Sequence, residues 1–151
     1  MPAVVGWLER LVACFVILAI GIIINAYGDG AMSMGRYLAL VRYGQSQYNA
    51  DNRFTGWRDP ALTARGLAEA SAVAVRLRNI GLPIDWIFCS ALIRTRETAE
   101  RVAYDLGRPN LPITSDAALD ERDYGELTGL NKDQACAHWG ESQVQRWRRS
   151  Y

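Results

Sequence analysis

Between residues 36 and 107 the hydrophobic positions alternate between short continuous runs and stripes of helical period. The first run, RYLALV at residues 36–41, is typical of a strand that is buried on both faces of a sheet. Thr63 is expected to cap a helix that continues to Asn79, and Gly81 and Pro83 end it. The apolar face of this helix consists of Leu67, Ala70, Ala74 and Leu77. The pattern therefore predicts a strand followed by an amphipathic helix.

The same pattern repeats further along the chain. IDWIFCS at residues 84–90 predicts a second buried strand, and Ser90 is expected to cap a second helix that ends near Gly107. The apolar stripe of this helix consists of Leu92, Ala99, Val102, Ala103 and Leu106. A short extended segment is predicted at residues 111–114, then a polar loop to Asn131, then one or two helices in residues 132–150. This order predicts an α/β fold with a mainly parallel sheet and helices on both faces.

The first 33 residues follow a different pattern. No charged side chain occurs from Leu11 to Gly28, and residues 11–24 are almost purely apolar. As a helix these fourteen residues would extend for about 21 Å, less than the roughly 30 Å of a bilayer core. Three interpretations compete: a marginal membrane anchor in residues 11–26, an export signal, or upstream sequence translated from a wrongly assigned start. Met32 and Met34 favour the last, so the globular domain is taken as residues 34–151 and the segment is left out of the fold.

Composition narrows the possible partners. The chain has 151 residues, half of them hydrophobic, and a net charge of +1, which is ordinary for a globular protein and gives no reason to expect nucleic acid as a partner. Cys14, Cys89 and Cys136 are odd in number and lack metal-ligand spacing. They are interpreted as inert reduced thiols, and no metal is expected.

Polar clusters follow each predicted strand. Arg42-Tyr43-Gly44 follows the first strand, residues 90–94 follow the second, and residues 120–129 follow the third. Because ligands bind beyond the carboxyl ends of parallel strands, the three clusters are expected to converge on one rim. The cations on that rim are Arg42, Arg94, Arg122, Lys132, Arg148 and Arg149. Around the single carboxylate of Glu121 they indicate phosphoryl chemistry.

Taken singly, these residues have simpler explanations. Arg148 and Arg149 alone would indicate a solvated helix end, and Glu121 alone a surface ion pair. His138 is expected to be an exposed helical residue. Trp57, Trp139 and Trp147 are expected to be packing residues, and Gly44 and Gly56 turn glycines. Only the joint order of the clusters favours a functional site.

Four blocks in order carry a family resemblance: RYGQSQYNADNRFTGWRDPALTARG, SALIRTRETA, LDERDYGELTGLNK and WRRSY. Together they resemble the cofactor-dependent phosphoglycerate mutases of the histidine phosphatase superfamily, over residues 36–151. The resemblance implies a three-layer α/β sandwich and interconversion of 2- and 3-phosphoglycerate in glycolysis and gluconeogenesis. It also implies 2,3-bisphosphoglycerate as a primer rather than a permanently bound cofactor, no metal, a small phosphorylated three-carbon acid as partner, and frequent homo-oligomers. A cytoplasmic globular part is expected, with membrane attachment possible only through the N-terminal segment.

The resemblance also implies roles for individual residues. Tyr43 lies in the nucleophile position, where the family has histidine, Glu121 is the acid/base, and Arg42 and Arg94 surround the transferring phosphoryl group. The implied substrate-binding positions are Gly44, Gln45, Ser46, Asn49, Thr55, Gly56, Arg122, Asp123, Tyr124, Lys132, Arg148 and Arg149.

Two departures from the family pattern predict that this chain is inactive or nearly so. A phenol, with an ordinary pKa of about 10, is a poor nucleophile at neutral pH, although nearby positive charge is expected to lower that pKa. The chain also ends at Tyr151, before the family's second catalytic histidine, and His138 is not a substitute for it. The C-terminal part of the domain is therefore expected to be missing, which would leave an apolar strand edge and helix faces exposed. Weak phosphate binding is expected to persist.

Overall fold

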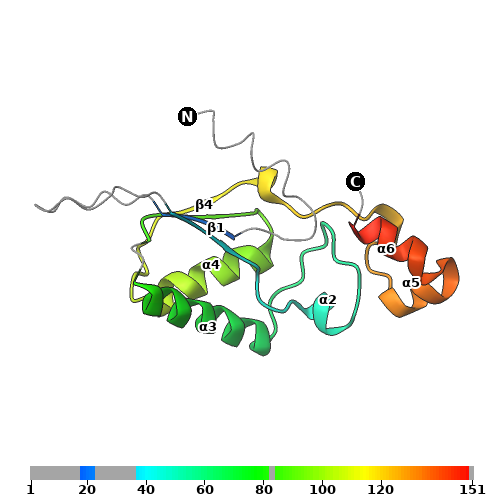
Figure 1. Cartoon of the computed structure of the whole chain (residues 1–151), viewed down its shortest axis with the longest axis horizontal. Helices are drawn as coiled ribbons and strands as arrows, with labels where there is room; N and C mark the ends of the chain where they lie inside the picture. Colours follow the sequence, from blue (N-terminus) through cyan, green and yellow to red (C-terminus); the bar gives the residue numbers. More distant parts are fainter. Residues whose placement is uncertain (1–17, 23–36, 82–83, 150–151) are drawn as a thin grey trace, which may run out of the picture.

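The computed structural model describes residues 18–22, 37–81 and 84–149, which form a four-stranded sheet, two long helices and a pair of short C-terminal helices (Figure 1). Strand β2 spans Tyr37–Val41, β3 spans Ile87–Cys89 and β4 spans Ile113–Ser115. β3 and β4 pair in parallel, with Phe88 opposite Thr114. The α/β class expected from the sequence is confirmed. β2 lies within one residue of its expected range, β3 is shorter than expected, and β4 begins two residues later than expected.

Helix α3, Ala64–Ile80, has the ends that its local sequence predicts. The Thr63 hydroxyl oxygen accepts a hydrogen bond from the Gly66 N–H at 3.1 Å, and Gly81 ends the helix in the left-handed conformation with φ of 72°. That conformation suits glycine because it has no Cβ. The apolar face faces the sheet through Ala70, Ala74 and Leu77.

Helix α4, Ile93–Asp105, begins differently from the expectation. The prediction that Ser90 caps it is wrong, because the N-cap residue is Leu92, which has no side-chain cap. The N–H of Ile93 donates instead to Asp59 Oδ1 at 2.6 Å, so a loop distant in sequence supplies the cap. The Ser90 hydroxyl accepts from the Leu92 N–H at 3.2 Å and lies 2.8 Å from the Thr95 hydroxyl.

The remaining elements are short. Helix α2, Gln47–Ala50, is closed by a capping box between Ser46 and Asn49. The 3-10 turns η1, Ala117–Leu119, and η2, Gly125–Leu127, interrupt the predicted polar loop. Two helices follow, α5 (Lys132–Trp139) and α6 (Glu141–Arg149), in the region where one or two were expected. Figure 1 shows this pair at the end of the molecule away from α3.

The sheet contains a strand from the N-terminal segment that was left out of the fold. β1, Leu18–Ile22, lies between β2 and β3, so the sheet order is β2-β1-β3-β4. It is antiparallel to both neighbours, which makes the sheet mixed at this end. Residues 18–22 are therefore part of the sheet, and the rest of the apolar segment lies outside the described residues. In the part of the chain that the structure describes, no helix is long and apolar enough to cross a membrane.

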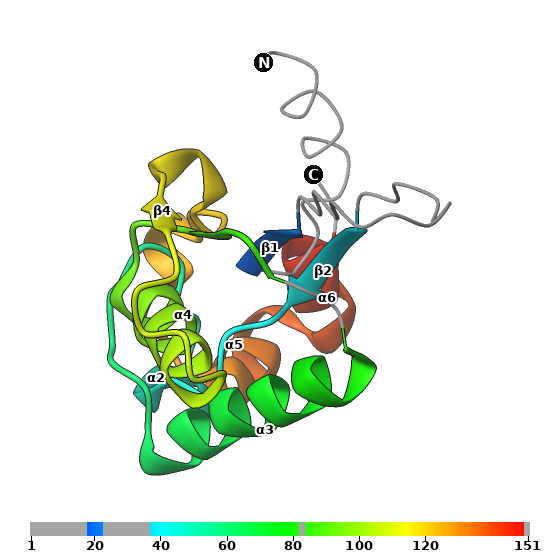
Figure 2. The same cartoon turned by 90° about the vertical axis from the view of Figure 1, so that its left-hand side faces the viewer.

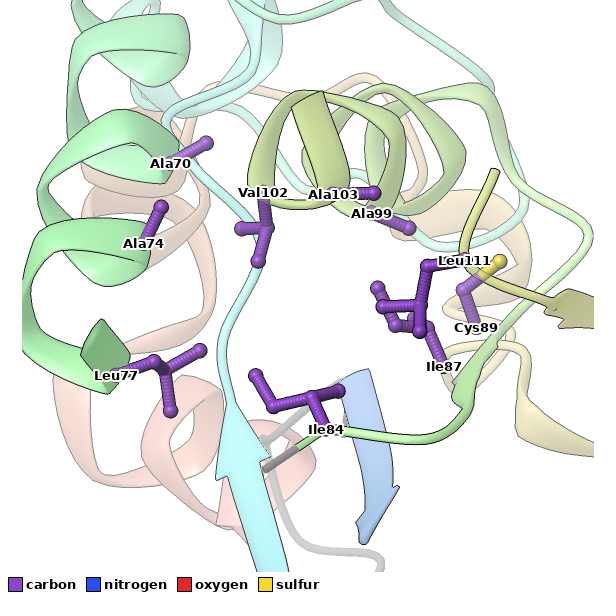
Figure 3. Close-up of a cluster of buried hydrophobic side chains, with 10 residues drawn as sticks. All are labelled: Ala70, Ala74, Leu77, Ile84, Ile87, Cys89, Ala99, Val102, Ala103 and Leu111. Carbon is purple, nitrogen blue, oxygen red and sulfur yellow. The ribbon is translucent and has the colours of Figure 1, made fainter. Parts of the chain in front are cut away.

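The main core lies between the sheet and the helices α3 and α4. Figure 3 shows Ala70, Ala74 and Leu77 of α3 facing Val102 and Ile84 across this space. Among the described residues both long helices lie on this face of the sheet, as Figure 2 also shows, so the prediction of helices on both faces is wrong for this part of the chain. On β2, Ala39 and Val41 pack against the core, whereas Leu38 and Leu40 are 58% and 49% exposed. This exposed apolar surface lies on the face of the sheet away from the core, whereas the sequence led us to expect it at a strand edge and on helix faces.

Candidate functional site

Three side chains from three segments meet at one carboxylate oxygen. Tyr43 follows β2 by two residues, Arg94 lies in the first turn of α4, and Glu121 follows η1. The Tyr43 hydroxyl donates to Glu121 Oε2 at 3.3 Å, and Arg94 Nη2 donates to the same oxygen at 2.8 Å. The strand-end clusters that the sequence placed on one rim therefore converge for these three residues.

Arg94 is fully buried, and its guanidinium group joins separate parts of the site. Nη1 donates to the carbonyl oxygen of Arg58 at 2.9 Å, and Nη2 donates to that of Gly56 at 3.0 Å as well as to Glu121. Its Nε atom is buried without a hydrogen-bond partner among the described residues. Arg94 therefore fixes the 56–58 loop and the acid/base candidate, and its Nε keeps one N–H for an additional acceptor.

The phenol of Tyr43 is 4% exposed and lies between charged groups. The guanidinium carbons of Arg42 and Arg94 lie 4.7 and 4.9 Å from the centroid of its ring. Cation–π contacts of this kind favour an aromatic ring at this position. Burial, with the Glu121 carboxylate adding to it, nevertheless raises the pKa of Tyr43 above its ordinary value, although both arginines act in the opposite direction. The arginines act on this pKa in the expected direction, but burial and the Glu121 charge outweigh them, so the phenol is protonated at neutral pH.

A pocket of about 90 Å³ opens beside Tyr43. Eight of the predicted site residues line it: Arg42, Tyr43, Asn49, Thr55, Glu121, Tyr124, Lys132 and Arg148. They come from the end of β2, from α2 and the loop after it, from the segment between η1 and η2, from the start of α5 and from the end of α6. The structure thus brings together five of the eight catalytic and cationic candidates from segments that are distant in sequence.

Gly44, Gln45 and Ser46 do not line the pocket, and hydrogen bonds from their backbone N–H groups hold them in place. The Gly44 N–H donates to Thr98 Oγ1 at 3.2 Å, and the Gln45 N–H donates to Glu69 Oε2 at 2.9 Å. A Cβ on Gly44 would lie 2.1 Å from the carbonyl oxygen of Gly66, so only glycine fits this contact. Ser46 is fully buried and caps α2. These residues shape the loop that carries Tyr43.

Four other candidates do not line the pocket. Gly56 has φ of 52° and accepts from Arg94 through its carbonyl oxygen. Arg122 Nη1 donates to the carbonyl oxygen of Trp147 at 3.0 Å, and Asp123 accepts from the Gly125 N–H at 2.8 Å. Arg149 lies at the end of α6, where its Nε donates to Gln145 at 3.4 Å.

Sequence reasoning missed two residues of the site. Phe54 lines the pocket, is 1% exposed and packs on Tyr124 with ring centroids 5.2 Å apart. Trp57, expected to be a packing residue, is 62% exposed, and its indole N–H donates to the carbonyl oxygen of Glu121 at 2.7 Å. Both belong to the FTGW sequence, whose similarity to the family was the available signal. Trp147, in contrast, packs against the small core of α5 and α6 as expected.

The pocket is suited to an anion and offers no metal centre. Arg42, Lys132 and Arg148 place three cationic side chains in its lining, opposite the single carboxylate of Glu121, which Arg94 already neutralises. This donor set fits the phosphate groups of 2,3-bisphosphoglycerate. Among the described residues no group of three or more metal-ligating side chains could hold a metal ion. His138 is exposed on α5, as expected.

Comparisons with known proteins agree with this geometry. Residues 38–151 match the model of the histidine phosphatase superfamily (branch 1). The chain is 55% identical over 118 residues to 2,3-bisphosphoglycerate-dependent phosphoglycerate mutases of Methylobacterium sp. (strain 4-46) and Brucella ovis. The match covers 78% of this chain and 57% of each relative, so the chain spans little more than half the length of these mutases.

Solved structures share the fold over a similar range. A mycobacterial glucosyl-3-phosphoglycerate phosphatase has a TM-score of 0.58 and 28% identity, with coverage of 68% of this chain and 47% of that protein. The phosphoglycerate mutase of Bacillus anthracis str. Sterne has a TM-score of 0.57 at 22% identity, with coverage of 69% and 47%, which shows the fold alone. With its matching residues, fold and strand-end site, the chain belongs to the histidine phosphatase superfamily, branch 1.

Proposed function

We propose that this chain is a phosphoglycerate mutase relative that keeps the anion-binding pocket but has lost the phosphoryl-transfer step. The reaction of its similar relatives would be the interconversion of 2- and 3-phosphoglycerate, primed by 2,3-bisphosphoglycerate, in glycolysis and gluconeogenesis. In this chain the reaction is absent or nearly so. Binding of a small phosphorylated three-carbon acid remains.

The contact between Tyr43 and Glu121 carries this proposal. The hydroxyl that replaces the family's imidazole donates to the acid/base candidate at 3.3 Å, and Tyr43 as a whole is 4% exposed. Because the pKa of Tyr43 is raised, its oxygen is a protonated donor rather than a nucleophile at neutral pH. Loss of a catalytic nucleophile costs a factor of about 10⁶ in rate in comparable enzymes.

The cationic lining supports retained binding. Arg42, Lys132 and Arg148 come from separate elements, so their convergence does not depend on Tyr43. Arginine forks and lysine ammonium groups form charge-assisted hydrogen bonds with phosphate and carboxylate oxygens. A phosphorylated carboxylic acid carries both kinds of oxygen, and 2,3-bisphosphoglycerate is the primer that the similarity to the mutases suggests.

A coupled mutase assay with 2,3-bisphosphoglycerate tests the loss of transfer. We expect no turnover from the purified wild type and none from Glu121→Ala. Wild-type turnover that Glu121→Ala abolishes would overturn the proposal. In Tyr43→His an imidazole returns to the nucleophile position, so this variant is expected to gain a phosphoryl group from 2,3-bisphosphoglycerate, measured as an increase in intact mass that the wild type lacks.

The alternative is a non-catalytic remnant that binds phosphate as its only activity, with membrane attachment through residues 11–26. The three pocket cations favour phosphate binding under either proposal. The two proposals differ in which phosphate compounds the pocket should prefer. Inorganic phosphate that binds as tightly as 3-phosphoglycerate supports the remnant, because the pocket would then not recognise the three-carbon acid. Sedimentation with phospholipid vesicles tests the membrane attachment.

A further inference from the structure

Strand β2 carries the nucleophile position, and its only sheet partner among the described residues is β1. The sheet order is β2-β1-β3-β4, so β2 is an edge strand and does not pair with β3. Helix α3 lies between β2 and β3 in sequence, and one other strand, β1, lies between them in the sheet. Without β1, both facing edges would present unpaired N–H and C=O groups, which are costly where water is excluded.

β1 pairs with β2 along its whole length and with β3 at one position. Its five residues pair with the five residues of β2, from Leu18 opposite Val41 to Ile22 opposite Tyr37. Ala19 pairs with Leu40 on one side and with Phe88 of β3 on the other. The sequence LAIGI has no polar position, which is typical of a strand inside a sheet rather than at its edge. Figures 1 and 2 show β1 beside β2, above helix α3.

We infer that residues 18–22 of the apolar N-terminal segment are a donor strand, which fills the slot between β2 and β3 of the same chain and holds the site-bearing strand ends at their spacing. β2 leads directly into Arg42 and Tyr43, and β3 leads into the turn before Arg94. The pairing of β1 with both strands therefore links the two sides of the rim. Insertion into a bilayer would compete with this role, because the same backbone cannot occupy both places.

Disulfide trapping tests the register directly. Gly21 pairs with Leu38, and paired antiparallel residues have Cα atoms about 4.5–5.5 Å apart, within disulfide range. The double variant Gly21→Cys/Leu38→Cys is expected to cross-link on mild oxidation. The matched control Gly21→Cys/Leu40→Cys is two residues out of register, so its Cα atoms are too far apart and it is expected to remain reduced.

Peptide mapping under non-reducing conditions identifies the linked pair and shows whether it lies within one chain. A cross-link within one chain in the paired variant alone supports the inference. Equal cross-linking in both variants, or none in either, would overturn the register. Cross-links between two chains would overturn the assignment to the same chain and show that a second copy donates the strand.

Amide exchange provides a measurement on the unaltered protein. The β2 amides that donate to β1 are expected to exchange at least about tenfold more slowly than unprotected peptide amides. Ala19→Pro removes the N–H at the residue that pairs with both neighbours, so it is expected to abolish this protection. Ala31→Pro, outside β1, is the control and is expected to leave it unchanged. Unprotected β2 amides in the wild type, or equal effects of the two variants, would contradict the inference.

Discussion

Two groups of charged side chains at the site differ in how they are held. Arg94 is fully buried and lies outside the pocket lining, bonded to Glu121 at 2.8 Å and to two backbone carbonyl oxygens, beside a core built by β3, α3 and α4. Lys132 and Arg148 line the pocket and are only partly buried, on helices that pack around a small separate core. The buried group therefore ties Glu121, the predicted acid/base, to the stable part of the fold. The partly buried group places positive charge where an anion would bind.

The largest effect is expected from Arg94→Met, which removes the buried positive charge beside Glu121. Glu121 and the carbonyl groups of Gly56 and Arg58 would lose their donor, so the free energy of unfolding should fall by about 3–5 kcal/mol. Arg101→Met is the matched control, because its ion pair with Asp105 is partly exposed and contributes about 1 kcal/mol or less. Urea denaturation measures both variants. Similar losses of stability in the two variants would show that the buried Arg94 contributes no more than a surface cation does.

Gly44→Ala should have the next largest effect, through the backbone below Tyr43. The new Cβ would lie 2.1 Å from the carbonyl oxygen of Gly66, and neither backbone segment can move without disturbing α3. We expect a loss of about 1–3 kcal/mol in the free energy of unfolding. Gly107→Asn is the control, because nothing lies within 4 Å of a Cβ at that position and asparagine tolerates positive φ. If Gly44→Ala unfolds at the same urea concentration as the wild type, this close approach is absent.

Trp57→Phe and Trp86→Phe compare a hydrogen bond at the candidate site with a similar one in the sheet. Each removes an indole N–H that donates at 2.7 Å, to the carbonyl oxygen of Glu121 and to Thr114 Oγ1 respectively. Both variants should lose about 0.5–1.5 kcal/mol of stability. Only Trp57→Phe should also weaken the binding of 3-phosphoglycerate, because it releases the segment that carries Glu121. If the two variants bind 3-phosphoglycerate equally well, Trp57 does not contribute to the site.

The smallest effect concerns Tyr43 and alkaline pH. A folded-state pKa raised above the ordinary value of about 10 means that the folded protein favours the neutral phenol. The resulting stability is fully present below about pH 10 and is lost as pH rises through the raised pKa. The difference in the free energy of unfolding between wild type and Tyr43→Phe should therefore be constant below pH 10 and shift against the wild type above it. Urea denaturation across this range measures it, and a pH-independent difference would indicate an unshifted phenol.

The parts of the fold that could be predicted are those with local signals. The helix-capping hydroxyl of Thr63 and the left-handed Gly81 lie next to α3, and a short apolar run marks β2. The cap of α4 could not be predicted, because Asp59 reaches it from a loop 34 residues earlier. The role of Leu18–Ile22 was missed because an apolar pattern shows that a segment avoids water but not which edges it pairs with.

The candidate site also has features that the sequence could predict and features that it could not. Strand-end position was enough to bring Tyr43, Arg94 and Glu121 together, since it follows from the order of the elements. The direction of the Tyr43 pKa was not predictable, because it depends on how far burial and the Glu121 charge outweigh two arginines. Arg149 and Arg148 are neighbours in sequence, yet only Arg148 lines the pocket, because successive residues of a helix point in different directions.

Calorimetric titration with 3-phosphoglycerate tests the central claim, that an anion pocket persists around a tyrosine that cannot transfer phosphate. We expect the wild type to release heat on binding, and Arg148→Ala to bind about tenfold or more weakly through the loss of a charge-assisted contact. Arg146→Ala, on the same helix but outside the pocket lining, should bind as the wild type does. A flat titration with folded wild-type protein, or equal weakening in both variants, would contradict the account.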